Sequence, residues 1–361
     1  MYKSLRRLLF RLEPETAHQL TLQALRIAGN FPLSKKILTQ VYKPPSQPVQ
    51  AFGLTFKNPV GLAAGFDKDA LAIAGLSALG FGHVEVGTIT PRPQPGNPSP
   101  RVFRLLEDEA VINRLGFPSR GSEFVQKRLN PYLRESLLEK YFGFVPFRRK
   151  YVARMIDKGD LILGINLGKN KDTPNEEAVL DYLELLQNFA PYGDYLTINI
   201  SSPNTVGLRQ LQGHTALESL LTHLDLQRKL EEQKLAKRIP LLVKLAPDLS
   251  VAELDDAVDV ILSTNMDGIL ATNTTLSREG LRSERRGETG GLSGGPLRLR
   301  SESVLRQVVR RVNGRIPIVS VGGIMNPEDA KRRLDMGATL VQIYTGLIYY
   351  GPGLVKKILE H

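Results

Sequence analysis

The stretch NISSPNTVGL, residues 199–208, gathers two asparagines, two serines and a threonine directly after the apolar run YLTI. A simple turn needs only one or two such residues, so this run is typical of a place where hydrogen-bonding groups meet a ligand. The chain contains no cysteine, which excludes disulfides, cysteine-ligated zinc, iron–sulfur clusters and a catalytic thiol. A hydroxyl of this run is therefore a candidate reactive group.

Two lysines are candidate contacts for an anionic or electron-rich ligand. Lys244 lies inside the apolar run PLLVKLA (240–246) with no acid on the same run. Because an unpaired buried charge is costly, an anionic or electron-rich ligand would suit it, such as a flavin that becomes anionic on reduction. The alternative is a side chain that extends outward at a strand end. Lys68, in AAGFDKD (63–69), either contacts an anionic substrate or begins the next helix.

Four asparagines follow apolar runs or lie on long loops: Asn113, Asn199, Asn204 and Asn273. Each could simply form a turn, but amides offer both donors and acceptors, and four at one rim would suit a planar heterocycle with alternating N–H and C=O groups. The five histidines are scattered without acids at metal-ligand spacing, so we expect no metal site.

Glycine-rich segments suggest a phosphate site. SVGGI (320–324) and QIYTG (342–346) end the last two predicted strands, and GGLSGG (290–295) precedes them. In barrels, backbone N–H groups after the seventh and eighth strands often hold a phosphate. The alternative is that these glycines only make tight turns.

The elements that must position these residues are eight apolar runs, each followed by a helical stretch. Such runs indicate a parallel sheet covered on both faces, and eight of them predict a (β/α)8 TIM barrel in the α/β class, with an open doubly wound sheet as the competitor. Because the strands' carboxyl ends share one face, the polar residues should converge there. The predicted strands are 59–65, 83–89, 161–167, 195–200, 240–246, 268–273, 317–323 and 339–345.

Residues 1–42 do not fit the barrel repeat and predict a separate amphipathic helical domain, with the barrel at 49–361. We expect a pair of helices: the first with Leu5, Leu8, Leu9 and Leu12 on one face, the second with a stripe of Ala17, Leu20, Ala24 and Ile27 and Gly29 as its C-cap. The segment 140–158, rich in aromatics and bases, predicts an insertion between helices.

The composition is that of a folded chain of 361 residues, with 42% hydrophobic residues and a net charge of +11. Nucleic acid, an anionic membrane or an anionic small molecule could each explain the charge. No apolar run is long enough to span a membrane and no cleavable signal peptide is evident, so any membrane contact is expected at the surface.

Taken together, these segments resemble the dihydroorotate dehydrogenases, FMN enzymes of pyrimidine synthesis. Class 1 members use a cysteine base, whereas class 2 members use a serine, carry an N-terminal helical domain and pass electrons to a membrane quinone. The absent cysteine, Ser202 and the EPETAH segment (13–18) resemble class 2, of bacterial type. The motifs are AAGFDKD, EVGTITPRPQPGNPSPR, INRLGF, GINLGKNKDTP, NISSPNTVGL, VKLAPDL, ATNTT, GGLSGGPL, VGGI and VQIYTG.

The resemblance implies roles for particular residues. Ser202 would be the base that takes the C5 proton of dihydroorotate while a hydride leaves C6 for the flavin, with Thr205 and Phe117 to orient the serine and exclude solvent. The implied FMN contacts are Ala64, Gly65, Phe66, Asp67, Lys68, Thr88, Asn166, Asn199, Lys244, Thr272, Gly294, Gly323, Tyr344 and Thr345. The implied dihydroorotate or orotate contacts are Lys68, Asn113, Arg114, Leu115, Gly116, Phe117, Asn199, Asn204, Asn273 and Thr274.

The resemblance also implies partners and a location. It predicts a peripheral, monomeric enzyme of UMP synthesis at the cytoplasmic face of the cell membrane, with no nucleic-acid partner. Its N-terminal helices would contact anionic lipid and admit the quinone. Two rivals are an RNA-modifying flavin barrel, which would use a cysteine that is absent here, and a non-redox phosphate-binding barrel, which would favour paired acids at the strand ends. A protein that binds flavin without turnover would leave Ser202 unexplained.

Overall fold

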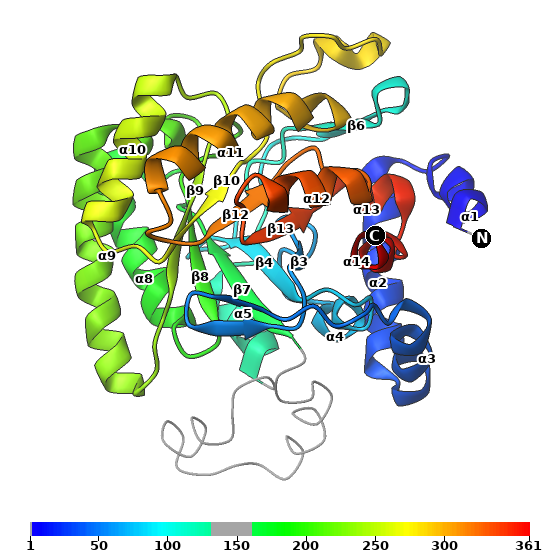
Figure 1. Cartoon of the computed structure of the whole chain (residues 1–361), viewed down its shortest axis with the longest axis horizontal. Coiled ribbons are helices and arrows are strands. Elements are labelled where there is room, and N and C mark those ends of the chain that lie inside the picture. The colour runs from blue at the N-terminus through cyan, green and yellow to red at the C-terminus, as the bar shows by residue number, and fades with distance from the viewer. Residues whose placement is uncertain (1, 131–160) are drawn as a thin grey trace.

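Eight parallel strands close into a barrel in the computed structural model, which describes residues 2–130 and 161–361 (Figure 1). Their order around the barrel is β10–β12–β13–β3–β4–β7–β8–β9, which confirms the predicted fold and rejects the open sheet. All eight arise from the apolar runs expected to form them. They are β3 (Val60–Leu62), β4 (His83–Ile89), β7 (Ile162–Leu167), β8 (Tyr195–Asn199), β9 (Leu241–Leu245), β10 (Gly268–Ala271), β12 (Ile318–Val321) and β13 (Leu340–Ile343).

Helices cover the outside of the barrel, and local sequence explains where they start. Helix α10 begins at a capping box in which Ser250 and Glu253 satisfy each other's backbone N–H groups. Asn326 caps α12 through its side chain, ahead of Pro327. The helices are α4 (Ile73–Ser77), α5 (Ser122–Leu129), α8 (Ala178–Phe189), α9 (His214–Leu235), α10 (Val251–Ser263), α11 (Arg298–Val312), α12 (Pro327–Asp335), α13 (Thr345–Tyr350) and α14 (Leu354–Glu360).

Two small antiparallel sheets close the ends of the barrel. The hairpin of β1 (Val49–Ala51) and β2 (Leu54–Phe56) buries its aromatic side chains under the barrel beside Tyr195. At the other end, β5 (Val102–Leu105), β6 (Ala110–Asn113) and β11 (Gly291–Gly294) form a three-stranded sheet. Part of the glycine-rich segment 290–295 is therefore a strand, which pairs with the strand that ends at Asn113.

Short 3-10 turns complete the connections of the described chain. They are η1 (Leu106–Asp108), η3 (Asn175–Glu177), η4 (Leu208–Gln212), η5 (Glu284–Gly287) and η6 (Gly295–Leu297). The predicted insertion at 140–158 lies outside the described residues.

The N-terminal segment forms three helices rather than the expected pair: α1 (Tyr2–Leu9), α2 (Pro14–Asn30) and α3 (Pro32–Tyr42). The prediction for Gly29 was wrong, since it lies inside α2 and not at a C-cap. A Cβ on Gly29 would stand 2.3 Å from the Gly75 backbone nitrogen, so glycine lets α2 and α4 touch. Pro32 then starts a third helix after Phe31.

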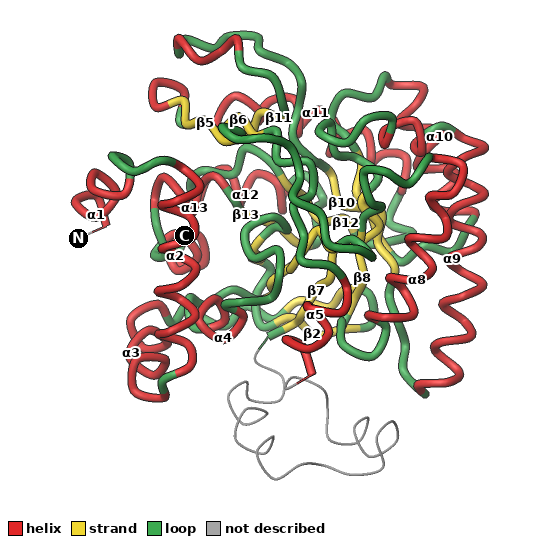
Figure 2. Tube along the Cα trace, turned by 180° about the vertical axis from the view of Figure 1, so that it is seen from behind, coloured by secondary structure: helices red, strands yellow, loops and turns green. Residues whose placement is uncertain are grey.

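These three helices lie on the side of the barrel opposite α8, α9 and α10, next to α13 and α14 (Figures 1 and 2). Tyr2 Oη donates to the Ile348 carbonyl at 2.5 Å and Arg6 donates to that of Tyr349 at 2.8 Å. The predicted stripe of α2 splits: Ala17 is buried, whereas Leu20 and Ile27 are 52% and 58% exposed. Part of the apolar face of α2 thus points away from the barrel.

Candidate active site

The carboxyl ends of the barrel strands meet at one cavity, as the topology requires. Most of the residues singled out from the sequence line it, although they come from segments that are far apart in the chain. They are Ala64, Gly65, Lys68, Thr88, Asn113, Leu115, Gly116, Phe117, Asn199, Ser202, Asn204, Lys244, Thr272, Asn273, Thr274, Gly294, Gly323, Tyr344 and Thr345.

Four of the expected contact residues do not line the cavity. The Asp67 carboxylate accepts from the backbone N–H groups that follow it in the chain, and the Phe66 ring packs between His18 and Tyr344. Arg114 points to Glu288, with a 2.6 Å ion pair, and lies over the Phe103 ring. Asn166 is buried one layer below the cavity. Asp67 and Arg114 therefore act on neighbouring chain segments in this structure.

Several cavity residues were not singled out from the sequence. Ser293 reaches the cavity because β11 pairs with β6, and its hydroxyl accepts from Thr345 Oγ1 at 2.8 Å. Gln342 is a polar residue inside an apolar run, the same signal that identified Lys244. The cavity residues that were missed are Ala63, Pro118, Ser293, Leu297, Val321, Ile324, Met325, Gln342, Ile343 and Gly346, whereas Gly322 of the expected SVGGI phosphate segment does line the cavity.

Ser202 stands at the cavity wall on the loop after β8 and is 5% exposed. Its Oγ accepts from the backbone N–H of Asn204 at 3.2 Å. The Thr205 hydroxyl is buried and has no hydrogen-bond partner among the described residues. Phe117, whose backbone φ is +52°, lines the same cavity. A hydroxyl in such a dry place can exchange a proton only with a bound ligand, a water or another hydroxyl.

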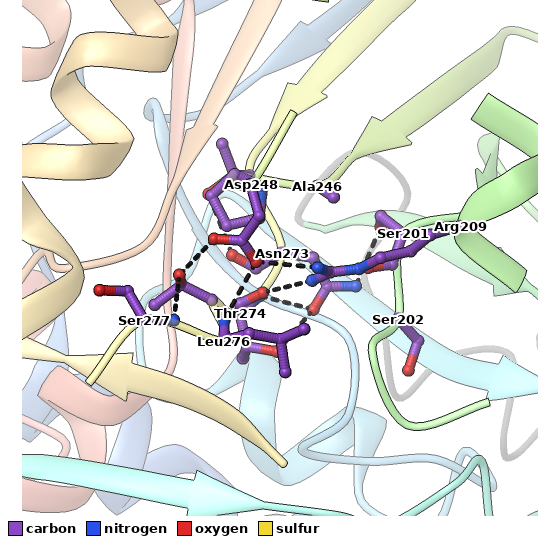
Figure 3. A network of polar contacts seen from close by, with 12 residues as sticks. Ser201, Ser202, Arg209, Ala246, Asp248, Asn273, Thr274, Leu276 and Ser277 are labelled. Atoms are coloured by element: carbon purple, nitrogen blue, oxygen red, sulfur yellow. Dashed lines mark hydrogen bonds and ion pairs between the residues drawn. The ribbon is translucent and has the colours of Figure 1, made fainter. Parts of the chain in front are cut away.

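Arg209 braces the loop that carries Ser202 (Figure 3). Its Nε donates to the Ser201 carbonyl at 3.0 Å, and its Nη2 donates to the Thr274 carbonyl at 2.9 Å. The remaining nitrogen pairs with Asp248 at 2.8 Å. One guanidinium therefore ties together the loops after β8, β9 and β10, while Ser202 points away from this cluster. Neither Arg209 nor Asp248 was singled out from the sequence.

The four expected amides come together in two pairs. Asn204 Nδ2 donates to Asn113 Oδ1 at 3.1 Å, which joins the β8 loop to β6. Asn273 Nδ2 donates to Asn199 Oδ1 at 3.3 Å, which joins the ends of β10 and β8. All four line the cavity, so its rim offers amide donors and acceptors to a flat ligand.

Both candidate lysines face inward. Lys244 is 5% exposed and, within the described chain, has no hydrogen-bond or ion-pair partner, so the outward-pointing alternative is rejected. Burial lowers the pKa of Lys244, and the Glu85 carboxylate opposes that shift. Burial also lowers the pKa of Lys68, whose Nζ donates to the Gly65 carbonyl at 2.9 Å. The cavity therefore presents two amines to whatever it holds, one from the buried Lys244 and one from the half-buried Lys68.

The glycines at one end of the cavity are required by space as well as by conformation. A Cβ on Gly294 would lie 2.4 Å from the Glu109 carbonyl oxygen, and one on Gly323 would lie 2.4 Å from the Arg298 Cα. Both have positive φ. Their bare backbone lines the cavity beside Thr345.

Metal-ligand clusters and membrane-spanning helices are both missing from the described residues. No group of three or more His, Asp or Glu side chains is placed to hold a metal ion within residues 2–130 and 161–361. In the same ranges no helix has the length and apolar character to cross a membrane.

Comparison with known proteins agrees with this geometry. Residues 47–361 match the family model described as dihydroorotate dehydrogenase. A dihydroorotate dehydrogenase (quinone) of Halorhodospira halophila is 47% identical over 361 residues, covering 100% of this chain and 97% of the relative. The corresponding protein of an Anaeromyxobacter strain is 49% identical over 359 residues, covering 99% and 91%.

A solved structure gives the same answer. The ligand-free dihydroorotate dehydrogenase of Eimeria tenella superposes with a TM-score of 0.80 and 41% identity, covering 96% of this chain and 93% of that one. The family model, the full-length relatives and the shared fold confirm the resemblance seen in the motifs: the chain belongs to the dihydroorotate dehydrogenase family of oxidoreductases, among relatives of the quinone-dependent type.

Proposed function

We propose that this protein oxidises dihydroorotate to orotate in UMP synthesis, with FMN as its prosthetic group and a membrane quinone as electron acceptor. The observation that carries the proposal is the cavity itself. It places one buried serine, two lysines and four amides around a single space at the barrel mouth.

The residues present fit an FMN group. Lys244 is a buried amine without a protein partner in the described chain, which suits the electron-rich edge of an isoalloxazine. The bare backbones of Gly294 and Gly323, next to Thr345, would hold the phosphate, since any side chain there would collide with the chain behind it. FMN, when bound, would accept the hydride equivalent of the substrate and pass its electrons on to quinone.

Ser202 would take the C5 proton of dihydroorotate. A serine hydroxyl is a weak base, so it needs a dry site and an acceptor for its own proton. Ser202 is nearly fully buried, and the hydroxyl of Thr205, unpartnered in the described chain, lies further along the same loop. Thr205, directly or through a water, is the proposed acceptor of the relay.

The amides and Lys68 would orient the substrate. Its ring carries alternating N–H and C=O groups, which the pairs Asn113–Asn204 and Asn199–Asn273 can match with donors and acceptors. Lys68 supplies a half-buried amine for the substrate carboxylate. Holding the ring so that C5 faces Ser202 is worth several kcal/mol, of the order found for other positioned reactions.

The N-terminal helices (residues 1–42) would form the route for quinone and the contact with an anionic membrane surface. Nine large apolar side chains between Leu5 and Val41 are more than a third exposed, and arginines and lysines lie among them. From α2 a row of rings leads inward: His18 packs on Phe66 at 5.0 Å, and Phe66 on Tyr344 at 5.9 Å. Tyr344 lines the cavity. We therefore propose a peripheral enzyme at the cytoplasmic face of the membrane.

Anaerobic mixing tests the proposal. The purified protein should be yellow, should bleach when dihydroorotate is added without oxygen, and should regain its colour with quinone but not with fumarate or NAD. A colourless protein, or a yellow one that dihydroorotate does not bleach, would contradict the assignment.

A further inference from the structure

A buried carboxylate lies inside the barrel, one layer below the candidate cavity. Glu85, on β4, has no exposed surface. One of its oxygens accepts from Asn166 Nδ2 at 2.7 Å. The other accepts from Tyr195 Oη at 3.1 Å and from Gln342 Nε2 at 3.0 Å. Sequence reasoning passed over Glu85, although it is an acid within an otherwise apolar run.

A carboxylate can only accept hydrogen bonds, so a neighbouring side-chain amide must face it with the NH2 group. Asn166 must direct its NH2 group to Glu85, which leaves its carbonyl oxygen for the other side. That oxygen accepts from Thr88 Oγ1 at 2.6 Å and from Asn199 Nδ2 at 2.9 Å. The orientation of Asn166, set by Glu85, therefore also sets that of Asn199, which must direct its NH2 group to the Asn166 oxygen.

The same direction continues to the cavity rim. Because Asn199 turns its NH2 group inward, its oxygen points outward and accepts from Ser201 Oγ at 3.0 Å and from Asn273 Nδ2 at 3.3 Å. Asn273 in turn accepts from the backbone N–H of Thr274 at 2.8 Å. Three amides from β7, β8 and the end of β10 therefore stand head to tail, each with its NH2 group on the side of Glu85.

We propose that Glu85 is a positioning residue that fixes the donor and acceptor order of this amide row, and so the pattern that the rim presents to the pyrimidine ring. The inference rests on the proposed function, because it assumes that Asn199 and Asn273 hold that ring. The Glu85 carboxylate is also the acid whose charge acts on Lys244, so it supports both the amide row and the cationic side of the cavity.

Replacing Glu85 with glutamine removes the constraint while keeping the shape. The new amide at position 85 can offer either its oxygen or its NH2 group to Asn166, so Asn166, Asn199 and Asn273 can each exchange the positions of their oxygen and NH2 group. A reversed amide then places its NH2 group opposite an N–H group of the ligand, where the wild type places an oxygen. We expect E85Q to weaken orotate binding by about tenfold or more, since a matched hydrogen bond becomes an unmatched one. The measurement is isothermal titration of orotate into the flavin-loaded protein, together with kcat and KM for dihydroorotate.

Two further variants separate this role from plain stability. Y195F removes one donor to Glu85 but leaves the carboxylate and the amide row, so its orotate affinity should stay within about threefold of the wild type. The double variant E85Q/Q342E restores the order by exchanging the carboxylate and the amide. The carboxylate, now at position 342, can only accept, so the amide at position 85 must turn its NH2 group towards it and its oxygen to Asn166. Its orotate affinity should recover most of what E85Q lost.

The outcomes are distinct. Wild-type affinity in E85Q, or no recovery in the folded double variant, would overturn the inference. If E85Q does not yield folded protein, the double variant carries the test alone: affinity within about threefold of the wild type supports the amide order, and a tenfold loss refutes it. Failure of the proposed function is separate, because wild-type protein would then neither bind orotate nor bleach with dihydroorotate.

Discussion

Replacing Arg209 with alanine tests whether the brace behind Ser202 matters for the reaction. The side chain contributes two bonds to the Ser201 and Thr274 carbonyls and one ion pair with Asp248, whose side chain is 19% exposed (Figure 3). At about 1 kcal/mol for each neutral acceptor and somewhat more for the charged one, R209A should lower the free energy of unfolding by about 2–4 kcal/mol. It should also free the Ser201 carbonyl, and a displacement of about 1 Å next to Ser202 is expected to lower kcat by roughly ten- to a hundredfold.

The assay is the anaerobic rate of flavin reduction by dihydroorotate, measured beside a denaturation curve. Arg300 supplies a matched control, because it contacts the same Asp248 at 3.3 Å but, within the described chain, makes no hydrogen bond or ion pair with the Ser202 loop. R300A should therefore lower the rate of flavin reduction only slightly. If R209A lost stability but reduced its flavin at the wild-type rate, the brace would be structural only and the argument that it positions Ser202 would fail.

Other perturbations have equally direct outcomes. K244M should lose most of its FMN affinity while K244R keeps more of it, because the buried amine lacks another partner in the described chain. The measurement is flavin fluorescence on dilution, and equal FMN retention in both variants would count against a role for the positive charge. G323A should lose FMN in the same assay through a Cβ that lies 2.4 Å from the Arg298 Cα, and a folded G323A protein that kept its FMN would contradict the steric argument. L20E/I27E should reduce sedimentation with anionic vesicles, whereas L226E, a similarly exposed leucine on α9, should not; parallel losses would show a non-specific effect. Burial lowers the pKa of His83 to about 3, so the folded state resists protonation of this side chain, and the free energy of unfolding should fall as pH drops from 6.5 towards 3. In denaturation curves at pH 7 and pH 5, H83Q should lose about 2 kcal/mol less of its free energy of unfolding than the wild type loses. An unchanged difference between the two pH values would show that His83 is not responsible.

The barrel was predictable because its strands are buried on both faces and read as continuous apolar runs. All eight strands fell where those runs are, and Lys244 stood out as a charge within one of them. The convergence of Asn199, Asn204 and Asn273 followed from the topology, because they lie at or after the carboxyl ends of β8 and β10, and the strands of a parallel barrel end on the same side.

What the sequence did not reveal depends on contacts between distant segments. The pairing of β11 with β6 places Ser293 in the cavity. The local pattern GGLSGG does not indicate that this segment is a strand or that its partner lies at residues 110–113. Gly29 was mistaken for a cap because its signal is the same whether a helix ends or crosses another backbone closely. Arg209 and Glu85 act through partners on other strands and loops, so their types alone gave no reason to prefer them over the many other charged residues.

The most direct test of the account is the reduction of bound FMN in S202A. The variant should bind FMN and orotate like the wild type, because Ser202 Oγ has only the Asn204 N–H as a partner within the described residues, yet its rate of bleaching by dihydroorotate should fall by about a hundredfold or more. Bleaching at the wild-type rate would remove the proton acceptor from the centre of the proposed mechanism.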